Sequence, residues 1–237
     1  MIASIAQTLL RTYSSTRQHE RVDPDQKGLF QNRMEDYAQR YQFAQQYVKD
    51  KRVLDIACGE GYGTSIIAPL AHSVVGVDTD IEAITFARER YGSVDERARF
   101  VHADALDYLH DLKNTFDVIL SFETIEHVAD PHRFLALLHK TLKVGGTLLL
   151  STQNKLFSDV FFGGTANPYH VKEFYIAELR AQIKELFHLT PTLYLQGPIA
   201  EGAIVSSTLF TFFFRRSKII QEKAGYSGLN MIFAVTK

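Results

Sequence analysis

The first group of residues that could carry chemistry combines a glycine loop with three carboxylates. A short apolar run containing Asp55 leads into residues 59–63, where glycine stands at alternate positions. Glycine lets the backbone turn sharply and come close to a ligand. Asp78 ends a second apolar run about twenty residues after the loop, the spacing at which an acid accepts hydrogen bonds from both ribose hydroxyls. Asp104 ends a third run, where it is placed to meet an adenine amino group.

Carboxylates at the ends of three successive strands would point into one crevice. Such a crevice suits an adenosine that carries a positive charge and suits a pyrophosphate poorly. Asp55 leaves two interpretations open, because it could contact this ligand or bind backbone N–H groups of the turn as a structural acid. The loop and its acids therefore predict a nucleoside site.

The second group consists of two carboxylates and two imidazoles. Glu123, Glu126 and His127 are spaced i, i+3 and i+4, so in a helical turn they lie on one face. His170 follows later in the chain, after Asn167-Pro168. His127 could act as a general base, bind a metal or bond a neighbouring carbonyl, and His170 could instead cap the following helix.

Both groups need elements that bring several strand ends together. Predicted helices alternate with apolar strands, which is typical of a mostly parallel sheet with right-handed crossovers. We predict an α/β fold with a Rossmann-like, doubly wound, seven-stranded, mostly parallel sheet and helices on both faces. The first five strands are expected at 53–57, 73–78, 99–104, 116–121 and 147–151, after a turn at 144–146. Helices are expected at 32–48, 64–70 and 81–91, the last capped by Asp80, and a further helix opens at Asp130-Pro131.

The alternation changes after residue 151. Residues 152–172 are predicted to be loop, followed by a helix over 172–187, strands at 192–196 and 229–236, and an insertion over 198–228. We expect one domain over residues 1–237, with an N-terminal helical cap at 1–48, a ligand-binding core at 49–151, and substrate-covering segments with the last strands at 152–237.

Composition narrows the classes of protein. The 26 basic and 27 acidic residues nearly balance, so no global charge draws the chain to nucleic acid. The single cysteine, Cys58, favours a reducing compartment. No apolar run is long enough for a membrane span, and no basic residue precedes Arg11, which argues against a signal peptide. We expect a cytoplasmic protein.

The motifs together resemble class I S-adenosylmethionine-dependent methyltransferases over about residues 32–187. The resemblance rests on Asp55-x-x-x-Gly59-x-Gly61-x-Gly63, Val77-Asp78, Asp104, Phe116-Asp117-Val118-Ile119 and Lys143-Val144-Gly145-Gly146. It implies that the loop and Asp55 meet the methionine portion, Asp78 the ribose and Asp104 the adenine. Arg40 or Tyr41 either reaches the methionine carboxylate or has a core or surface role. The implied cofactor-binding residues are Arg40, Tyr41, Asp55, Ala57, Gly59, Gly61, Gly63, Asp78, Thr79, Asp104, Ala105 and Ser121.

The second group also carries a resemblance. Glu-x-x-Glu-His and the later segment 167–174 resemble the subfamily around ubiquinone-biosynthesis O-methyltransferases. They are also similar to small-RNA 2′-O-methyltransferases, in which the four corresponding residues hold a divalent metal. The resemblance implies His127, His170 and Glu126 as catalytic residues. It also implies a site for Mg²⁺, Mn²⁺ or Zn²⁺ at Glu123, Glu126, His127 and His170, although mixed carboxylate and imidazole ligands are less typical of Mg²⁺.

The sequence therefore predicts methyl transfer from S-adenosylmethionine to a hydroxyl of a small molecule, such as a sugar or glycan, a phenol or another biosynthetic metabolite. Two alternatives remain: a nicotinamide-dependent dehydrogenase, disfavoured by the glycine spacing, and a non-catalytic S-adenosylmethionine-binding protein. The aromatic run at 209–216 could form a homodimer contact or a satellite core, or could touch a membrane or an isoprenoid substrate.

Overall fold

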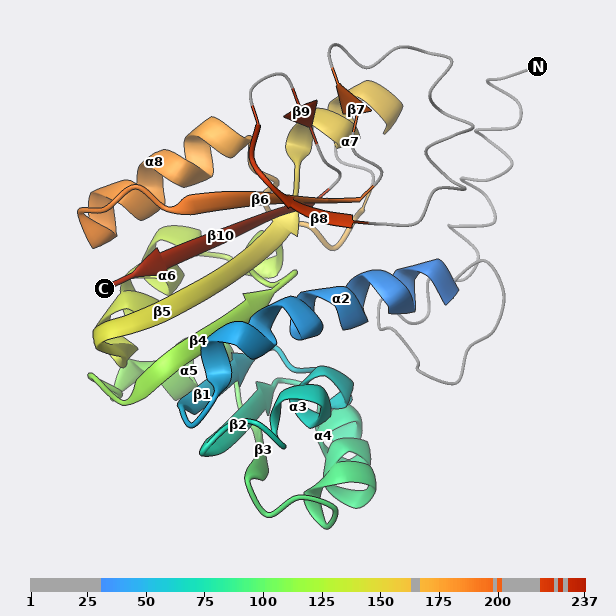
Figure 1. Ribbon diagram of the computed structural model, residues 1–237, viewed down its shortest axis with the longest axis vertical. Helices are drawn as coiled ribbons and strands as arrows, with labels where there is room; N and C mark the ends of the chain where they lie inside the picture. Colours follow the sequence, from blue (N-terminus) through green and yellow to red (C-terminus); the bar gives the residue numbers. More distant parts are fainter. Residues whose placement is uncertain (1–30, 163–166, 198–199, 202–217, 224–225, 228–229) are drawn as a thin grey trace.

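An eight-stranded sheet forms the centre of the fold (Figure 1). The computed structural model describes residues 31–162, 167–197, 200–201, 218–223, 226–227 and 230–237. The strands of the sheet are β1 (Arg52–Ile56), β2 (Ser73–Asp78), β3 (Ala98–His102), β4 (Phe116–Phe122), β5 (Leu142–Gln153), β6 (Thr192–Gly197), β8 (Lys218–Gln221) and β10 (Asn230–Thr236). Their order is β3-β2-β1-β4-β5-β10-β6-β8. A separate antiparallel pair joins β7 (Ala200–Glu201) to β9 (Tyr226–Ser227).

The sheet confirms the predicted α/β, doubly wound class. The pairs from β3 to β5 are parallel, whereas β10 runs antiparallel to β5 and β6. The predicted number of seven strands is wrong, because β8 pairs antiparallel with β6 as an eighth, edge strand. Its four residues lie in the segment predicted as an insertion, and so short a run shows no periodicity that separates it from its surroundings.

Helices cover both faces of the sheet, as predicted (Figure 1). The helices and turns are α2 (Gln31–Val48), α3 (Tyr62–Ile67), α4 (Ile81–Ala87), the π turn η1 (Arg88–Gly92), α5 (Ala105–His110), the 3₁₀ turn η2 (Ile125–His127), α6 (Pro131–Thr141), α7 (Lys155–Phe162) and α8 (Ile176–Phe187). One apolar cluster packs α2, α3 and α4 on one face, and another packs α5, α6 and α8 on the other. Along β4, Val118 and Leu120 join the first cluster and Ile119 joins the second, because successive side chains of a strand alternate between faces.

Several predicted boundaries need correction. The stretch 152–172 is not all loop, because α7 forms there and buries Phe157 while the Asn154 side chain accepts the N–H of Leu156. The helix predicted from residue 172 begins at Ile176, and the helix predicted over 81–91 is α4 followed by η1. The predicted turn at 144–146 lies inside β5, where Gly145 has a φ of 77°.

Some predictions fall outside the described residues. The first thirty residues of the expected N-terminal cap and the aromatic run at 209–216 belong to this part of the chain. Within the described residues, no helix combines the length and the apolar character that a membrane span requires.

Candidate functional site

The carboxyl ends of β1 and β4 lie side by side at the point where the strand order reverses. From β1 the chain proceeds outward to β2 and β3, and it then returns to place β4 on the other side of β1. Crevices of this kind hold ligands in open α/β sheets. Residues of both groups singled out in the sequence stand at this edge: the glycine loop follows β1, and Glu123, Glu126 and His127 follow β4.

The three glycines of the loop are needed for different reasons. Gly59 has a φ of 56°, and a Cβ there would meet nothing within 4 Å, so its backbone is open to a ligand. A Cβ on Gly61 would lie 2.6 Å from the Phe100 ring, and one on Gly63 would lie 1.9 Å from Cζ of Tyr41. Packing therefore requires glycine at the second and third positions, whereas the first is left facing open space.

Asp78 and Asp104 each hold backbone at a strand end. The Asp78 carboxylate accepts the N–H of Gly59 at 2.8 Å and that of Asp80 at 2.9 Å, which fixes the loop against the end of β2. Asp104 caps α5 by accepting the N–H of Leu106 at 2.8 Å, and Ala105 is the first residue of that helix. Asp80 caps α4, as predicted.

Asp55 is buried, with 1% of its surface exposed. Its carboxylate accepts the Thr64 hydroxyl at 2.6 Å and the Tyr41 hydroxyl at 3.1 Å. Burial raises the pKa of Asp55 to about 7, although both hydroxyl groups oppose this effect. These contacts favour a structural acid, but its partners are the hydroxyls of Thr64 and Tyr41 and not the backbone N–H groups expected from the sequence.

The raised pKa of Asp55 makes stability depend on pH. The folded state retains a proton that the unfolded chain releases near pH 3.8, so this stabilisation is full below that pH and is lost as pH rises through about 7. We expect the free energy of unfolding to fall over this window by up to about 4 kcal/mol. Asp55→Asn should flatten the dependence, as measured by urea unfolding at pH 5 and pH 8. An equal slope in both proteins would contradict this prediction.

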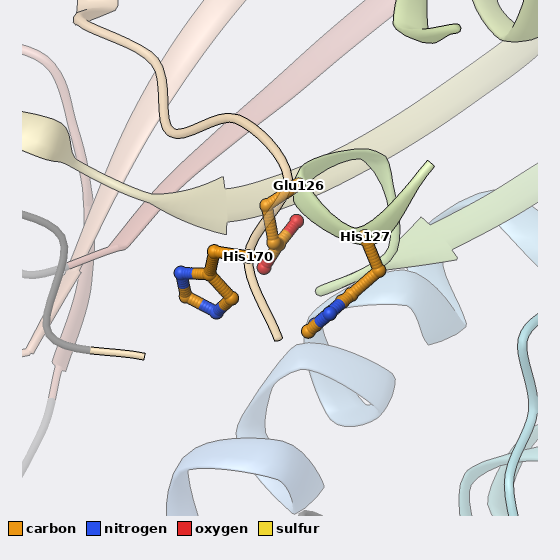
Figure 2. A group of neighbouring side chains, drawn as sticks. All are labelled: Glu126, His127 and His170. Atoms are coloured by element: carbon orange, nitrogen blue, oxygen red, sulfur yellow. The ribbon is translucent and has the colours of Figure 1, made fainter. Parts of the chain in front are cut away.

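Three residues of the second group converge. The ligand atoms of Glu126, His127 and His170 all lie within 4.8 Å of one another (Figure 2). The two imidazole rings meet edge to face with their centroids 4.9 Å apart. Glu126 and His127 come from η2, whereas His170 comes from the segment before α8, so residues far apart in the sequence meet at the end of β4.

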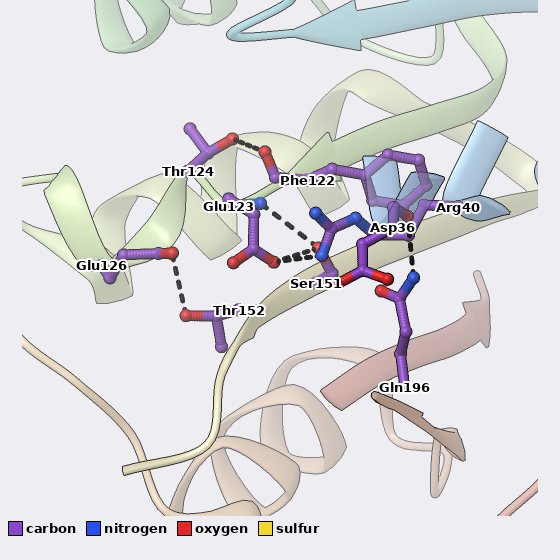
Figure 3. A network of polar contacts seen from close by, with 9 residues as sticks. All are labelled: Asp36, Arg40, Phe122, Glu123, Thr124, Glu126, Ser151, Thr152 and Gln196. Atoms are coloured by element: carbon purple, nitrogen blue, oxygen red, sulfur yellow. Dashed lines mark hydrogen bonds and ion pairs between the residues drawn. The ribbon is translucent and has the colours of Figure 1, made fainter. Parts of the chain in front are cut away.

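Glu123 does not join them, and its predicted place in the group is wrong. It has a φ of 51°, directly after β4, and η2 begins only at Ile125, so the i, i+3 relation to Glu126 fails. Its carboxylate accepts the Arg40 guanidinium at 3.0 Å and the Ser151 hydroxyl at 2.7 Å (Figure 3). The left-handed backbone thus turns this acid toward α2.

Arg40, Tyr41 and Ser121 are buried at the same edge. Arg40 pairs with Glu123, and the Tyr41 hydroxyl bonds Asp55, so within the described structure both bind protein carboxylates. The Ser121 hydroxyl has no hydrogen-bond partner among the described residues. The other implied cofactor residues, Ala57 and Thr79, follow β1 and β2 directly.

Glu126 is the most buried member of the converging group. The Thr152 hydroxyl donates to its Oε2 at 2.8 Å, while Oε1 has no hydrogen-bond partner among the described residues. Burial, followed by the nearby charge of Glu123, raises the pKa of Glu126 well above its usual range. A buried carboxylate oxygen without a partner is costly, so this atom is suited to bind a proton or a cation.

Backbone contacts hold both histidines in place. His127 Nδ1 lies 3.1 Å from the carbonyl of Tyr169, and the carbonyl of Glu126 accepts the N–H groups of Val171 at 2.8 Å and Lys172 at 3.1 Å. A carbonyl can only accept, so Nδ1 of a neutral His127 carries the hydrogen and Nε2 keeps its lone pair.

One functional residue, Thr152, was not predicted from the sequence. No local signal marks it, because the Thr152 side chain reaches Glu126 only through the pairing of β5 with β4.

Comparisons with known proteins find methyltransferases. Residues 54–150 match the family model described as methyltransferase domain. A Mycolicibacterium smegmatis protein named "Probable S-adenosylmethionine-dependent methyltransferase" is 36% identical over 128 residues, covering 54% of this chain and 48% of that protein. A ubiquinone biosynthesis O-methyltransferase of Aromatoleum aromaticum is 30% identical over 122 residues, covering 52% of each. The chain thus matches about half the length of these relatives.

Solved structures share the fold over a longer range. A SAM-dependent methyltransferase from Archaeoglobus fulgidus superposes with a TM-score of 0.59 and 19% sequence identity, covering 84% of this chain and 92% of that chain. At this identity the likeness concerns the fold, which is that of the class I methyltransferases.

Proposed function

We propose, from the premise that residues 54–150 form a methyltransferase domain, that this protein transfers a methyl group from S-adenosylmethionine to a hydroxyl of a small molecule. The observation that carries the proposal is a juxtaposition. The group of Glu126, His127 and His170 stands at the end of β4, next to β1, whose loop offers the open backbone of Gly59. A cofactor on the loop would place its reactive end near groups that can take a proton.

The cofactor would lie along the ends of β1, β2 and β3. Asp78 would accept the ribose hydroxyls, Gly59 would allow close approach of the backbone, and Asp104 would lie near the adenine. Arg40 would reach the methionine carboxylate only by sharing its guanidinium with Glu123. Asp55 would act indirectly, through Tyr41 and Thr64.

The transfer itself is a direct displacement. The acceptor oxygen forms a bond to the methyl carbon, the bond from carbon to the sulfonium sulfur breaks, and the sulfur keeps the electron pair. Alignment of acceptor and methyl group supplies much of the acceleration. The hydroxyl proton would pass to an imidazole Nε2, and His127 suits this role because the carbonyl of Tyr169 occupies its Nδ1.

The residues present also fit a divalent metal. The donor set is one buried carboxylate, whose Oε1 has no partner among the described residues, with the imidazoles of His127 and His170. This mixture of oxygen and nitrogen donors suits Mn²⁺ or Zn²⁺ better than Mg²⁺. For metal-assisted transfer we propose Glu126, His127 and His170 as its ligands, without Glu123. This role is the alternative to proton transfer to His127, because the single lone pair on its Nε2 can bind either a metal or a proton. A bound metal would lower the pKa of an acceptor hydroxyl.

The proposal also covers the class of acceptor, the location of the protein and its assembly. The near balance of 26 basic and 27 acidic residues favours a small-molecule acceptor over nucleic acid. A sugar, a phenol and another metabolite all fit a hydroxyl acceptor. We further propose that the protein is cytoplasmic, has one domain and forms a homodimer. Analytical ultracentrifugation would test the homodimer by measuring the mass in solution.

Two measurements test the proposed function. Calorimetry should detect binding of S-adenosylmethionine and S-adenosylhomocysteine, and none of NAD⁺. Incubation with a panel of sugars, phenols and quinols should release S-adenosylhomocysteine above the rate of cofactor hydrolysis, with the methylated acceptor found by mass spectrometry. Repeating the assay after chelation, and with Mn²⁺ or Zn²⁺ restored, separates metal-assisted from metal-free transfer. Binding of NAD⁺ instead would indicate a dehydrogenase, and cofactor binding without transfer would indicate a non-catalytic binder.

A further inference from the structure

We propose that Glu173 is a positioning residue of this site, which holds His170 in one tautomer and one orientation. Its Oε1 lies 2.7 Å from Nδ1 of His170, and the two side chains are 1% and 2% exposed. Nothing in the sequence interpretation assigned a role to this acid. The consequence of this role for methyl transfer rests on the proposed function. The effect of Glu173 on the tautomer of His170 can be measured without any methyl transfer.

The chemistry of the contact determines the tautomer. An ionised carboxylate only accepts hydrogen bonds, so Nδ1 of a neutral His170 carries the hydrogen and Nε2 keeps the lone pair. His127 is held in the same way by the carbonyl of Tyr169. In both imidazoles the lone pair is therefore on Nε2, and both rings belong to the converging group (Figure 2).

The backbone makes this contact rigid. The segment that carries His170 and Glu173 is tied to η2 by the two N–H groups of Val171 and Lys172, which bond the carbonyl of Glu126. Phe174 pairs with Asn154 at the end of the segment. The acid, the imidazole and Glu126 are thus placed relative to one another by main-chain hydrogen bonds.

The burial of the Glu173 carboxylate indicates a role beyond packing. Oε2 of Glu173 is buried without a hydrogen-bond partner among the described residues, and Oε1 of Glu126 is in the same condition. A buried carboxylate that is only partly satisfied costs stability, so an apolar side chain would serve packing better. A carboxylate behind a histidine instead orients the ring and raises the electron density at its far nitrogen.

The test compares Glu173→Gln and Glu173→Asp with Glu178→Gln. Glu178 is the matched control, because it lies five residues away with 36% of its side chain exposed, in a surface ion pair with Lys172. The ¹⁵N shifts of His170 should show hydrogen on Nδ1 in the wild-type protein, in Glu173→Asp and in the control. In Glu173→Gln they should show a mixture of tautomers, since an amide can both donate and accept. A wild-type tautomer in a folded Glu173→Gln protein would overturn the proposal.

A second readout uses Co²⁺ as the probe of the same three donors. We expect Glu173→Gln to weaken Co²⁺ binding roughly 10–100-fold, the usual effect of losing an outer partner of a histidine ligand. Glu173→Asp should recover part of the loss, and Glu178→Gln should bind as the wild type. Absence of methyl transfer in the wild type would count against the proposed function and leave the tautomer result standing. Equal Co²⁺ affinity in Glu173→Gln and the wild type would contradict the role of Glu173.

Discussion

His127→Ala is expected to lower the rate of methyl transfer roughly 10²–10⁴-fold, the usual range for loss of an acid–base group. The imidazole belongs to the only group of at least three potential metal-binding side chains found in the described part of the chain. Its Nδ1 is occupied by the carbonyl of Tyr169, which leaves Nε2 for the acceptor proton or for a metal. Affinity for S-adenosylmethionine should barely change, because Asp78 and the glycine loop lie elsewhere at the sheet edge.

The measurement is single-turnover transfer at saturating cofactor, with calorimetry of cofactor binding beside it. His132→Ala is the matched control, since this histidine lies five residues away on α6 and is exposed. The control should transfer at the wild-type rate. A His127→Ala protein that does the same would leave His127 a structural residue.

Asp78→Ala is expected to weaken S-adenosylmethionine binding by at least about 100-fold. Each hydrogen bond from a ribose hydroxyl to a carboxylate contributes about 1.5–3 kcal/mol, and this acid can accept two. The structure adds a second cause, because the same carboxylate bonds the N–H groups of Gly59 and Asp80 and so shapes the loop. The effect should exceed that of removing a ribose contact alone.

Calorimetry with S-adenosylhomocysteine measures the loss, and thermal unfolding reports whether the variant is folded. Asp107→Ala serves as the control, since Asp107 is an exposed acid in the first turn of α5 near the same edge. Its affinity should match the wild type. Unchanged affinity in a folded Asp78→Ala protein would show that the ribose assignment is wrong.

Local pattern was sufficient for every strand of the sheet except β8, and for the position of the loop. Alternating apolar runs and amphipathic stretches carry their own periodicity, and strand, glycine loop and helix follow one another directly along the chain. The cap at Asp80 is equally local, because its partners are two and three residues away. The short strand β8 escaped prediction because four residues carry too little pattern.

The composition of the site depended on contacts between distant segments. Asp55 has one local partner, Thr64, but its other hydroxyl partner is Tyr41 of α2, which packs over Gly63. Spacing placed Glu123 beside Glu126, yet a left-handed backbone at Glu123 turns its carboxylate to Arg40. Sequence spacing predicts side-chain direction only where the backbone is regular, and the turn after β4 is not.

Besides Glu126, a second acid, Glu173, meets one of the histidines, His170, and lies three residues after it. The sequence shows both residues and their spacing, but it does not show that main-chain bonds to Glu126 bring their segment against η2. The residue types available to this site were therefore determined by the sequence itself. Their assembly into one group was decided by tertiary structure, because Glu126 and His127 lie about forty residues before His170 along the chain and meet it only through the folded backbone.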